Sequence, residues 1–174
     1  MEPIAIRPAR REELEEIWAL VRRAVAHMNQ LGNPQWGEDY PTRDFYAGDI
    51  HRGELYAALV DGKLAGVACI NTAESPEYDP LPWTTPRPAV VIHRMAVDPA
   101  CQRSGVGSAL FCFAQEEARR LGLESMRIDT YSLNHRMQAL IRKMGYRQVG
   151  KIHLHGRPLP YPCFEKDLRK EVRP

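Results

Sequence analysis

A predicted strand that runs into a helix beginning with two glycines is the feature that most constrains how this chain folds. Residues 89–97 form an apolar run that predicts a strand, which ends at Asp98-Pro99. Residues 104–121 predict a helix, because apolar side chains recur there at steps of three and four. Gly105 and Gly107 lie in its first turn. A buried strand followed by a short loop and a helix indicates an α/β domain.

The start of this helix has the features of an anion-binding site. The first four N–H groups of a helix have no partner within it, and the helix dipole makes that end positive. Glycines let a bulky anion approach the backbone, and Arg103 adds a formal charge. A diphosphate fits better than a carboxylate, because several N–H groups converge. In the alternative interpretation the glycines only allow close packing of the helix on a strand, but the preceding Gln102-Arg103 pair favours the anion site.

The rest of the chain predicts one α/β domain over residues 1–174, with a mixed sheet. Strands are predicted at residues 4–8, 55–60, 63–70, 89–97, 126–130, 146–151 and 163–167. Helices are predicted at residues 10–29, 42–50, 104–121 and 134–144. The clearest local signal is Asp61-Gly62 between two apolar runs, which is typical of a β-hairpin. Residues 74–88 contain five prolines and predict a loop.

Composition excludes several classes of protein. The chain has 24 Lys+Arg against 22 Asp+Glu, a balance that disfavours a dedicated nucleic-acid binder. It has no run of 18 apolar residues for a membrane span, and its first residues lack the apolar core of a signal peptide. Four scattered cysteines predict reduced thiols and a cytoplasmic protein. His153 and His155 share a strand face, but the local sequence offers too few further ligands, so we expect no metal.

Other phosphate-binding motifs fit the segment less well. The P-loop pattern is absent. A dinucleotide fingerprint would use Gly105 and Gly107, with Asp129 placed 22 residues after Gly107 to bind a ribose. Leu110 occupies the position of its third glycine, and residues 98–104 separate the strand end from Gly105, whereas the fingerprint needs its glycines at the turn itself.

These residues resemble the GNAT superfamily of N-acetyltransferases. Met95-Ala96-Val97, followed by Gln102-Arg103-Ser104-Gly105-Val106-Gly107, is similar to the family's Q/R-x-x-G-x-G/A signature. The later run from Asn134 to Gly145-Tyr146 resembles its N…G-F/Y segment. The order of predicted elements also matches over nearly the whole chain. The resemblance implies a mostly antiparallel sheet of about seven strands with four helices, splayed between the fourth and fifth strands.

The resemblance further implies acetyl-CoA as the acyl donor. Its pantetheine arm would pair with the backbone of the Met95-Ala96-Val97 strand end, between the splayed strands. Its pyrophosphate would lie on the helix start, on residues Gln102, Arg103, Ser104, Gly105, Val106, Gly107 and Ser108. Asn134 would contact the arm from the next helix. An edge strand near Cys163 would allow a homodimer, by family analogy alone.

Catalysis needs a base for the acceptor amine and an acid for the departing thiolate. Many relatives carry a tyrosine acid seven residues after the asparagine, where this chain has Ile141. Tyr131 is our main substitute and Tyr146 a second one. For the base we predict His93, since a two-residue period places it on the side of Met95 and Val97. The alternative for each is an ordinary half-buried side chain of the sheet.

The acceptor site is predicted in the loops at residues 35–41 and 74–88. Trp36, Tyr40 and Trp83, together with Tyr78, would line a pocket, or else cover the core. Glu38 and Asp39 would hold a cationic amine, which favours a small-molecule acceptor. Cys101 and Cys163 would permit a covalent acetyl-enzyme, but Cys101 lies in the phosphate loop, so direct transfer is preferred.

Three functions remain to be distinguished. The first is an N-acetyltransferase that uses acetyl-CoA. The second is a non-catalytic acyl-CoA-binding sensor or interaction domain, which Ile141 would permit. The third is a nucleotide-dependent enzyme that uses Gly105 and Asp129.

Overall fold

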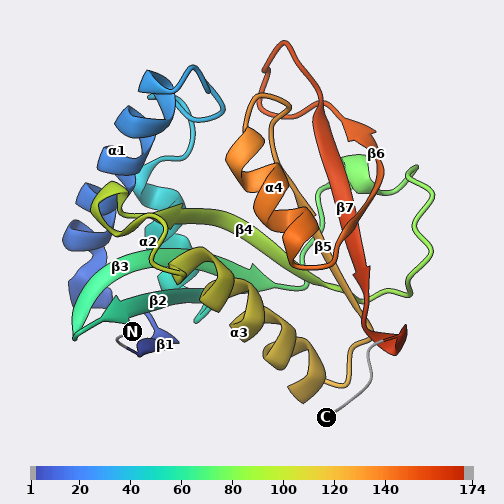
Figure 1. Cartoon of the computed structure of the whole chain (residues 1–174), viewed down its shortest axis with the longest axis horizontal. Coiled ribbons are helices and arrows are strands. Elements are labelled where there is room, and N and C mark those ends of the chain that lie inside the picture. The colour runs from blue at the N-terminus through green and yellow to red at the C-terminus, as the bar shows by residue number, and fades with distance from the viewer. Residues whose placement is uncertain (1–2, 171–174) are drawn as a thin grey trace. The chain divides into compact units, whose positions relative to one another are not determined.

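The computed structural model describes residues 3–170 and shows an α/β fold with one seven-stranded mixed sheet (Figure 1). Hydrogen-bonded neighbours follow the order β1-β2-β3-β4-β5-β7-β6. The strands are β1 (Ile4–Pro8), β2 (Leu55–Val60), β3 (Lys63–Asn71), β4 (Val90–Val97), β5 (Ser125–Asp129), β6 (Arg147–Ile152) and β7 (Tyr161–Asp167). The helices are α1 (Leu14–Gln30), α2 (Arg43–His51), α3 (Val106–Arg120) and α4 (His135–Lys143). The predicted fold class is therefore confirmed.

The chain forms two compact units. Of the described residues, the first comprises 3–70 and 93–113, and the second comprises 71–92 and 114–170. Both β4 and α3 contribute residues to each unit. A single domain over residues 1–174 stays a prediction.

In the first unit, β1, β2 and β3 form an antiparallel ribbon. Asp61 and Gly62 both have positive φ, at 51° and 73°, as a tight hairpin turn requires, so the predicted hairpin is confirmed. One face of α1 buries Ile17, Leu20, Val21 and Ala24. These side chains pack in a core that also contains Leu55 and Val67 of the hairpin. Burial of this helix face fixes α1 on the sheet, because apolar surface is removed from water.

In the second unit, β5 pairs with a parallel and an antiparallel neighbour. Its parallel register with β4 covers two residue pairs, Val90 with Met126 and Val91 with Arg127. Its antiparallel register with β7 covers the whole of β5, from Ser125 to Asp129. Pairing of the two parallel strands thus ends at Arg127, while β5 continues to Asp129. This short parallel pairing agrees with the predicted separation of the fourth and fifth strands.

Opposite faces of the second unit are covered by different segments. On one face, the Arg142 guanidinium of α4 lies 5.2 Å from the centre of the Phe164 ring. On the other face, the proline-containing loop is ordered by contacts with buried charges. Glu165 accepts hydrogen bonds from the hydroxyls of Thr84 and Thr85 at 2.6 and 2.8 Å. This loop also contains the 3₁₀ turn η2 (Pro76–Tyr78).

None of the helices in the described part of the chain combines the length and the apolar character needed to cross a bilayer.

Candidate functional site

The predicted strand–loop–helix segment is present, and local hydrogen bonds shape its loop. After β4 ends at Val97, a 3₁₀ turn, η3 (Pro99–Cys101), reverses the chain. The Asp98 carboxylate stabilises this turn, accepting from the Ala100 amide at 3.0 Å and from the Arg23 guanidinium at 2.7 Å. Helix α3 begins at Val106, two residues later than predicted. The turn therefore places the helix start a few residues beyond the end of β4.

The backbone amides at the start of α3 have no hydrogen-bond partner among the described residues. The first helical hydrogen bond joins the Ala109 amide to the Gly105 carbonyl at 2.9 Å. Among residues 3–170, no group accepts a hydrogen bond from the amides of Gly105, Val106, Gly107 or Ser108. Ser104 differs, since its amide donates to the Cys101 carbonyl at 3.3 Å. Four successive amides are thus available to a ligand at the positive end of a helix.

Gly105 keeps this helix start open. Its φ of +87° is a conformation that other residues rarely adopt, and Arg103 has a φ of +66°. A Cβ built on Gly105 would lie 3.9 Å from its nearest neighbour, the Ile4 Cδ1 atom, so no packing contact requires a glycine there. The alternative interpretation, that this glycine serves close packing, therefore has no support at Gly105. Its backbone conformation and the open space above it favour the anion site.

Close packing instead requires Gly66 of β3, which our sequence analysis did not identify. A Cβ at Gly66 would lie 2.8 Å from the Val106 Cγ1 atom and 3.1 Å from the Ala96 carbonyl oxygen. Because glycine has no Cβ, β3 can approach both the last residues of β4 and the first residue of α3. The sequence did contain a signal for this contact, because a glycine inside a predicted strand often marks the close approach of another segment.

An irregularity in β4 changes the interpretation of His93. Arg94 has a φ of +48°, a left-handed conformation within the strand. The alternation of side chains is interrupted there, so the two-residue period no longer supports a shared face for His93, Met95 and Val97. His93 is half-buried. The role of His93 as a base stays a prediction, but the strand period that placed it beside Met95 and Val97 no longer supports it.

Arg94 forms a buried ion pair with Asp49 of α2. Its Nε atom donates to Asp49 Oδ2 at 2.8 Å, and its Nη2 atom donates to Asp49 Oδ1 at 2.7 Å. The Asp49 side chain is 0% exposed and the Arg94 side chain is 13% exposed. Burial alone would lower the pKa of Arg94, but the hydrogen bonds with Asp49 leave that pKa raised. This pair ties α2 to the irregular part of β4.

The Asp49 carboxylate also lies in a cluster of three side chains of types that can bind a metal ion. Potential ligand atoms of Asp49, Glu54 and Cys69 lie within 4.8 Å of one another. Asp49 already accepts from Arg94 and from Arg52, the latter at 2.7 Å. Burial and the nearby Asp49 raise the pKa of the Cys69 thiol to about 12, which opposes the thiolate that a metal would need. We interpret the group as an ion-pair network.

The predicted tyrosine acids lie in the second unit. Tyr131 is 0% exposed, and its hydroxyl oxygen accepts from the Leu159 amide at 3.2 Å. Tyr146 is 6% exposed, with its hydroxyl 3.5 Å from the sulfur of Met126. Ile141 is fully buried, as its place in an apolar helix face predicts. The side chain of Asn134, predicted to contact the donor, caps α4 by accepting from the Met137 amide at 3.1 Å.

The predicted acceptor residues divide between the two units. In the first, Trp36 is 6% exposed and belongs to the core, while the Tyr40 hydroxyl accepts from Arg94 Nη1 at 3.4 Å. In the second, Trp83 lies half-buried over the Arg127 guanidinium at 4.2 Å. Its Nε1 atom donates to the Tyr78 carbonyl at 2.8 Å. Tyr40 and Trp83 are therefore partly accessible, and Trp36 is mainly a core residue.

Asp129, considered above only for a dinucleotide site, has an unusual environment at the end of β5. The Tyr78 hydroxyl donates to its Oδ2 atom at 2.6 Å. Burial raises the pKa of Asp129 to about 6, against the lowering effect of the Tyr78 hydrogen bond. The carboxylate therefore changes protonation state near pH 6.

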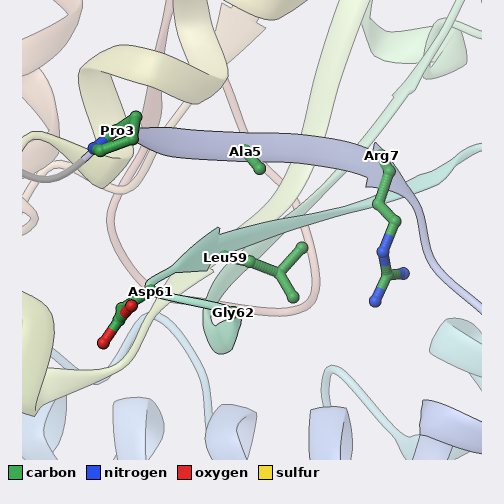
Figure 2. A pocket seen from close by; sticks show the side chains of 6 residues that line it. All are labelled: Pro3, Ala5, Arg7, Leu59, Asp61 and Gly62. Carbon is green, nitrogen blue, oxygen red and sulfur yellow. The ribbon is translucent and has the colours of Figure 1, made fainter.

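A depression of about 460 Å³ includes none of the predicted site residues in its lining (Figure 2). It is lined by Pro3, Ala5, Arg7, Leu59, Asp61 and Gly62. Figure 2 shows Arg7 and Asp61 at opposite ends of this lining. Arg7 is already bound through two hydrogen bonds of 2.8 Å to Glu13, so the depression offers little free chemistry.

Comparisons with known proteins agree on one family. The sequence model of the acetyltransferase (GNAT) family matches residues 14–146. The uncharacterized N-acetyltransferase YvbK of Bacillus subtilis (strain 168) is 28% identical over 107 residues, which span 62% of this chain and 61% of that protein. A GNAT-family acetyltransferase structure from Streptococcus agalactiae 2603 has a TM-score of 0.83 at 28% identity, covering 97% of this chain and 96% of that one. The structure of yncA from Salmonella typhimurium, solved with its cofactor acetyl-CoA, has a TM-score of 0.70 at 20% identity, covering 98% and 97%.

Proposed function

The chain belongs to the acetyltransferase (GNAT) family, and we propose that it transfers the acetyl group of acetyl-CoA to a primary amine of a small-molecule acceptor. The start of α3 carries this proposal. The amides of Gly105, Val106, Gly107 and Ser108 have no partner among residues 3–170, and these four donors match the several acceptor oxygens of a pyrophosphate. Arg103 is exposed beside them and supplies a formal positive charge.

The remaining donor contacts are proposed from the family signature. The backbone of Met95, Ala96 and Val97 would bind the pantetheine arm, with Gln102 and Asn134 as further contacts. The acetyl-CoA bound to yncA supports this donor, since that protein shares the fold. Acetyl-CoA would supply a thioester, whose acetyl carbon is open to attack by an uncharged amine.

Tyr131 stays our proposed acid for the thiolate. Its buried hydroxyl accepts from Leu159, but no described residue accepts its hydrogen. A buried tyrosine hydroxyl usually donates, so this hydrogen is free for proton transfer once a ligand gains access to the 0%-exposed side chain. We expect Tyr131→Phe to lower kcat while leaving acetyl-CoA affinity unchanged, and an unchanged kcat would exclude this role.

Tyr40 and Trp83 are our proposed acceptor contacts, and Trp36 supports Tyr40 from the core against which Tyr40 packs. Both accessible rings lie beside an arginine, at Arg94 and Arg127 respectively. An alanine at either position should raise KM for the amine more than it lowers kcat, because lost binding affects ground and transition states alike.

We also propose that the enzyme works in the cytoplasm without a metal. All four cysteines are free thiols, which supports a reducing compartment. Direct transfer needs only positioning and proton transfer, so the chemistry calls for no metal.

The experiment that tests the function is a turnover assay. Purified protein is incubated with acetyl-CoA and a panel of primary amines, and free CoA and acetylated amine are quantified by chromatography and mass spectrometry. We expect acetyl transfer to at least one amine well above the uncatalysed rate. Acetyl-CoA binding without transfer to any amine would instead support the sensor interpretation, which the buried Ile141 at the usual tyrosine position favours.

A further inference from the structure

Asp129 differs from the other buried or half-buried carboxylates of the described residues because it forms no ion pair. Among residues 3–170, every other Asp or Glu that is buried or half-buried forms an ion pair with an arginine. The pairs are Glu13–Arg7, Asp49–Arg94, Glu54–Arg52, Glu74–Arg127, Asp98–Arg23, Glu117–Arg120, Glu165–Arg147 and Asp167–Arg169. Asp129 has no cationic partner within the described residues. A half-buried carboxylate without a counter-charge is costly, and a bound cation would remove that cost.

The carboxylate lies at a defined place on the sheet. Asp129 is the last residue of β5, two residues beyond Arg127, where hydrogen-bonded pairing with β4 ends. Arg127 shares its side of the strand by the two-residue period, but its guanidinium binds Glu74 at 2.8 Å. Across the sheet, Asp129 is opposite Cys163 of β7. The nearest arginine along the strand is therefore committed elsewhere.

Tyr78 fixes the orientation of this carboxylate. Its hydroxyl donates to Asp129 Oδ2 at 2.6 Å, and the tyrosine itself is 1% exposed. The Trp83 indole in turn donates to the Tyr78 carbonyl at 2.8 Å, and the two rings lie 5.0 Å apart. Two aromatic residues thus hold one oxygen of Asp129, while no described residue donates to Oδ1.

We propose that Asp129 binds the ammonium group of the acceptor and accepts its proton, with Tyr78 as the positioning residue. This inference rests on the proposed acetyltransferase function, in which an amine acceptor attacks the thioester of the donor. A half-buried carboxylate with one unoccupied oxygen offers an ammonium both an ion pair and a proton acceptor.

The proton balance of the reaction is complete with this residue. One proton moves from the ammonium to the Asp129 carboxylate, which leaves a neutral amine. The amine nitrogen forms a bond to the acetyl carbon, and the carbon–sulfur bond breaks with its electron pair remaining on sulfur. The nitrogen then loses its second proton to solvent, and the thiolate takes a proton from the Tyr131 hydroxyl to give free CoA, after which Tyr131 is reprotonated from solvent. Asp129 afterwards releases its proton to solvent.

The groups around Asp129 set the pH at which it can act. Burial raises its pKa to about 6, the Tyr78 hydrogen bond lowers it, and Glu77 of η2 raises it. From β7, the Cys163 thiol contributes no charge, because burial and Asp129 raise its pKa. Asp129 is therefore mainly ionised at pH 7.5 and protonated below pH 6. We expect kcat/KM to fall as pH decreases through about 6.

The test uses Asp129→Asn and Tyr78→Phe, with Asp79→Asn as a control in the adjoining exposed turn. The probe is an amine that the wild type acetylates in the panel above. We expect Asp129→Asn to lower kcat/KM at pH 7.5 by about 10²–10⁴-fold and to abolish the acidic limb, with acetyl-CoA affinity unchanged. In the wild type the Tyr78 hydrogen bond lowers the pKa of Asp129. Tyr78→Phe removes this bond, so the pKa of Asp129 should rise and the acidic limb should move to higher pH. Asp79→Asn should leave the profile as in the wild type.

A second readout separates this role from a structural one. A carboxyl whose pKa is raised on folding favours the folded state below its unfolded pKa of about 4 and loses that contribution as pH rises through about 6. Asp129→Asn should therefore increase the urea midpoint at pH 7.5. A lower midpoint with unchanged kcat/KM would show a structural residue and overturn the inference.

Two further outcomes are distinct. If the wild type acetylates the probe and Asp129→Asn keeps its acidic limb while His93→Gln loses it, His93 is the base and this inference is wrong. If the wild type binds acetyl-CoA but acetylates no amine, the proposed function fails, and this inference fails with it.

Discussion

Removing the Asp49 carboxylate should destabilise the protein strongly, because it leaves a shielded arginine without a counter-charge. Asp49 is 0% exposed and accepts two hydrogen bonds from Arg94, whose side chain is 13% exposed. Truncation of one partner of a buried ion pair costs about 3–5 kcal/mol. With a urea m-value of about 2 kcal/mol/M, Asp49→Ala should lower the unfolding midpoint by about 1.5–2.5 M.

The assay is urea unfolding followed by circular dichroism, with two comparison variants. Arg52 also binds Asp49, at 2.7 Å, but is 52% exposed, so Arg52→Ala should cost less than about 1 kcal/mol. Adding Arg94→Ala to Asp49→Ala should cost little more, because the unpaired charge is then removed. Equal effects of Asp49→Ala and Arg52→Ala, or full additivity of the Asp49 and Arg94 changes, would refute the buried-pair interpretation.

Three more predictions concern packing, thiol chemistry and pH. Gly66→Ala should lower the free energy of unfolding by about 1–3 kcal/mol and weaken acetyl-CoA binding, as measured by denaturation and calorimetry, because its Cβ would meet another atom at 2.8 Å. In the native protein Cys112, which is exposed, should react with a thiol reagent within minutes, whereas the buried Cys69, with a pKa of about 12, should not; equal rates would contradict this. Burial would raise the pKa of Glu165, but hydrogen bonds from two threonines leave it lowered, so Glu165→Gln should destabilise the protein at pH 7 and progressively less as pH falls below about 4, in urea titrations across pH.

Local sequence patterns predicted the elements of the fold well. Helix α1 was predicted by its apolar face, and the hairpin by Asp61-Gly62, because both signals depend only on nearby residues. The helix start at α3 was displaced by two residues, since the loop before it is stabilised by its own turn η3. Such end effects are set by specific hydrogen bonds that periodicity does not report.

The parts of the site that depend on distant contacts were not predictable. The left-handed conformation of Arg94 accompanies an ion pair with a residue 45 positions away, and it breaks the period used to place His93. The Tyr78–Asp129 hydrogen bond likewise joins residues 51 positions apart. The strand–loop–helix segment before α3 was predictable, because its residues are contiguous and the amides of a helix start lack partners without any distant contact. Its role in binding a phosphate stays a proposal.

Acetyl-CoA binding to Gly105→Val, measured by titration calorimetry, tests the central claim most directly. Gly122→Val is the matched control, since Gly122 also has a positive φ, +71°, but follows the opposite end of α3 and has open space around its Cβ position. We predict that Gly105→Val loses at least tenfold in affinity for acetyl-CoA, because a branched side chain would cover the free amides, whereas Gly122→Val, folded by circular dichroism, binds like the wild type. Wild-type affinity in Gly105→Val, or no binding of acetyl-CoA to the unmodified protein at millimolar concentration, would contradict the assignment of the α3 start as the donor site.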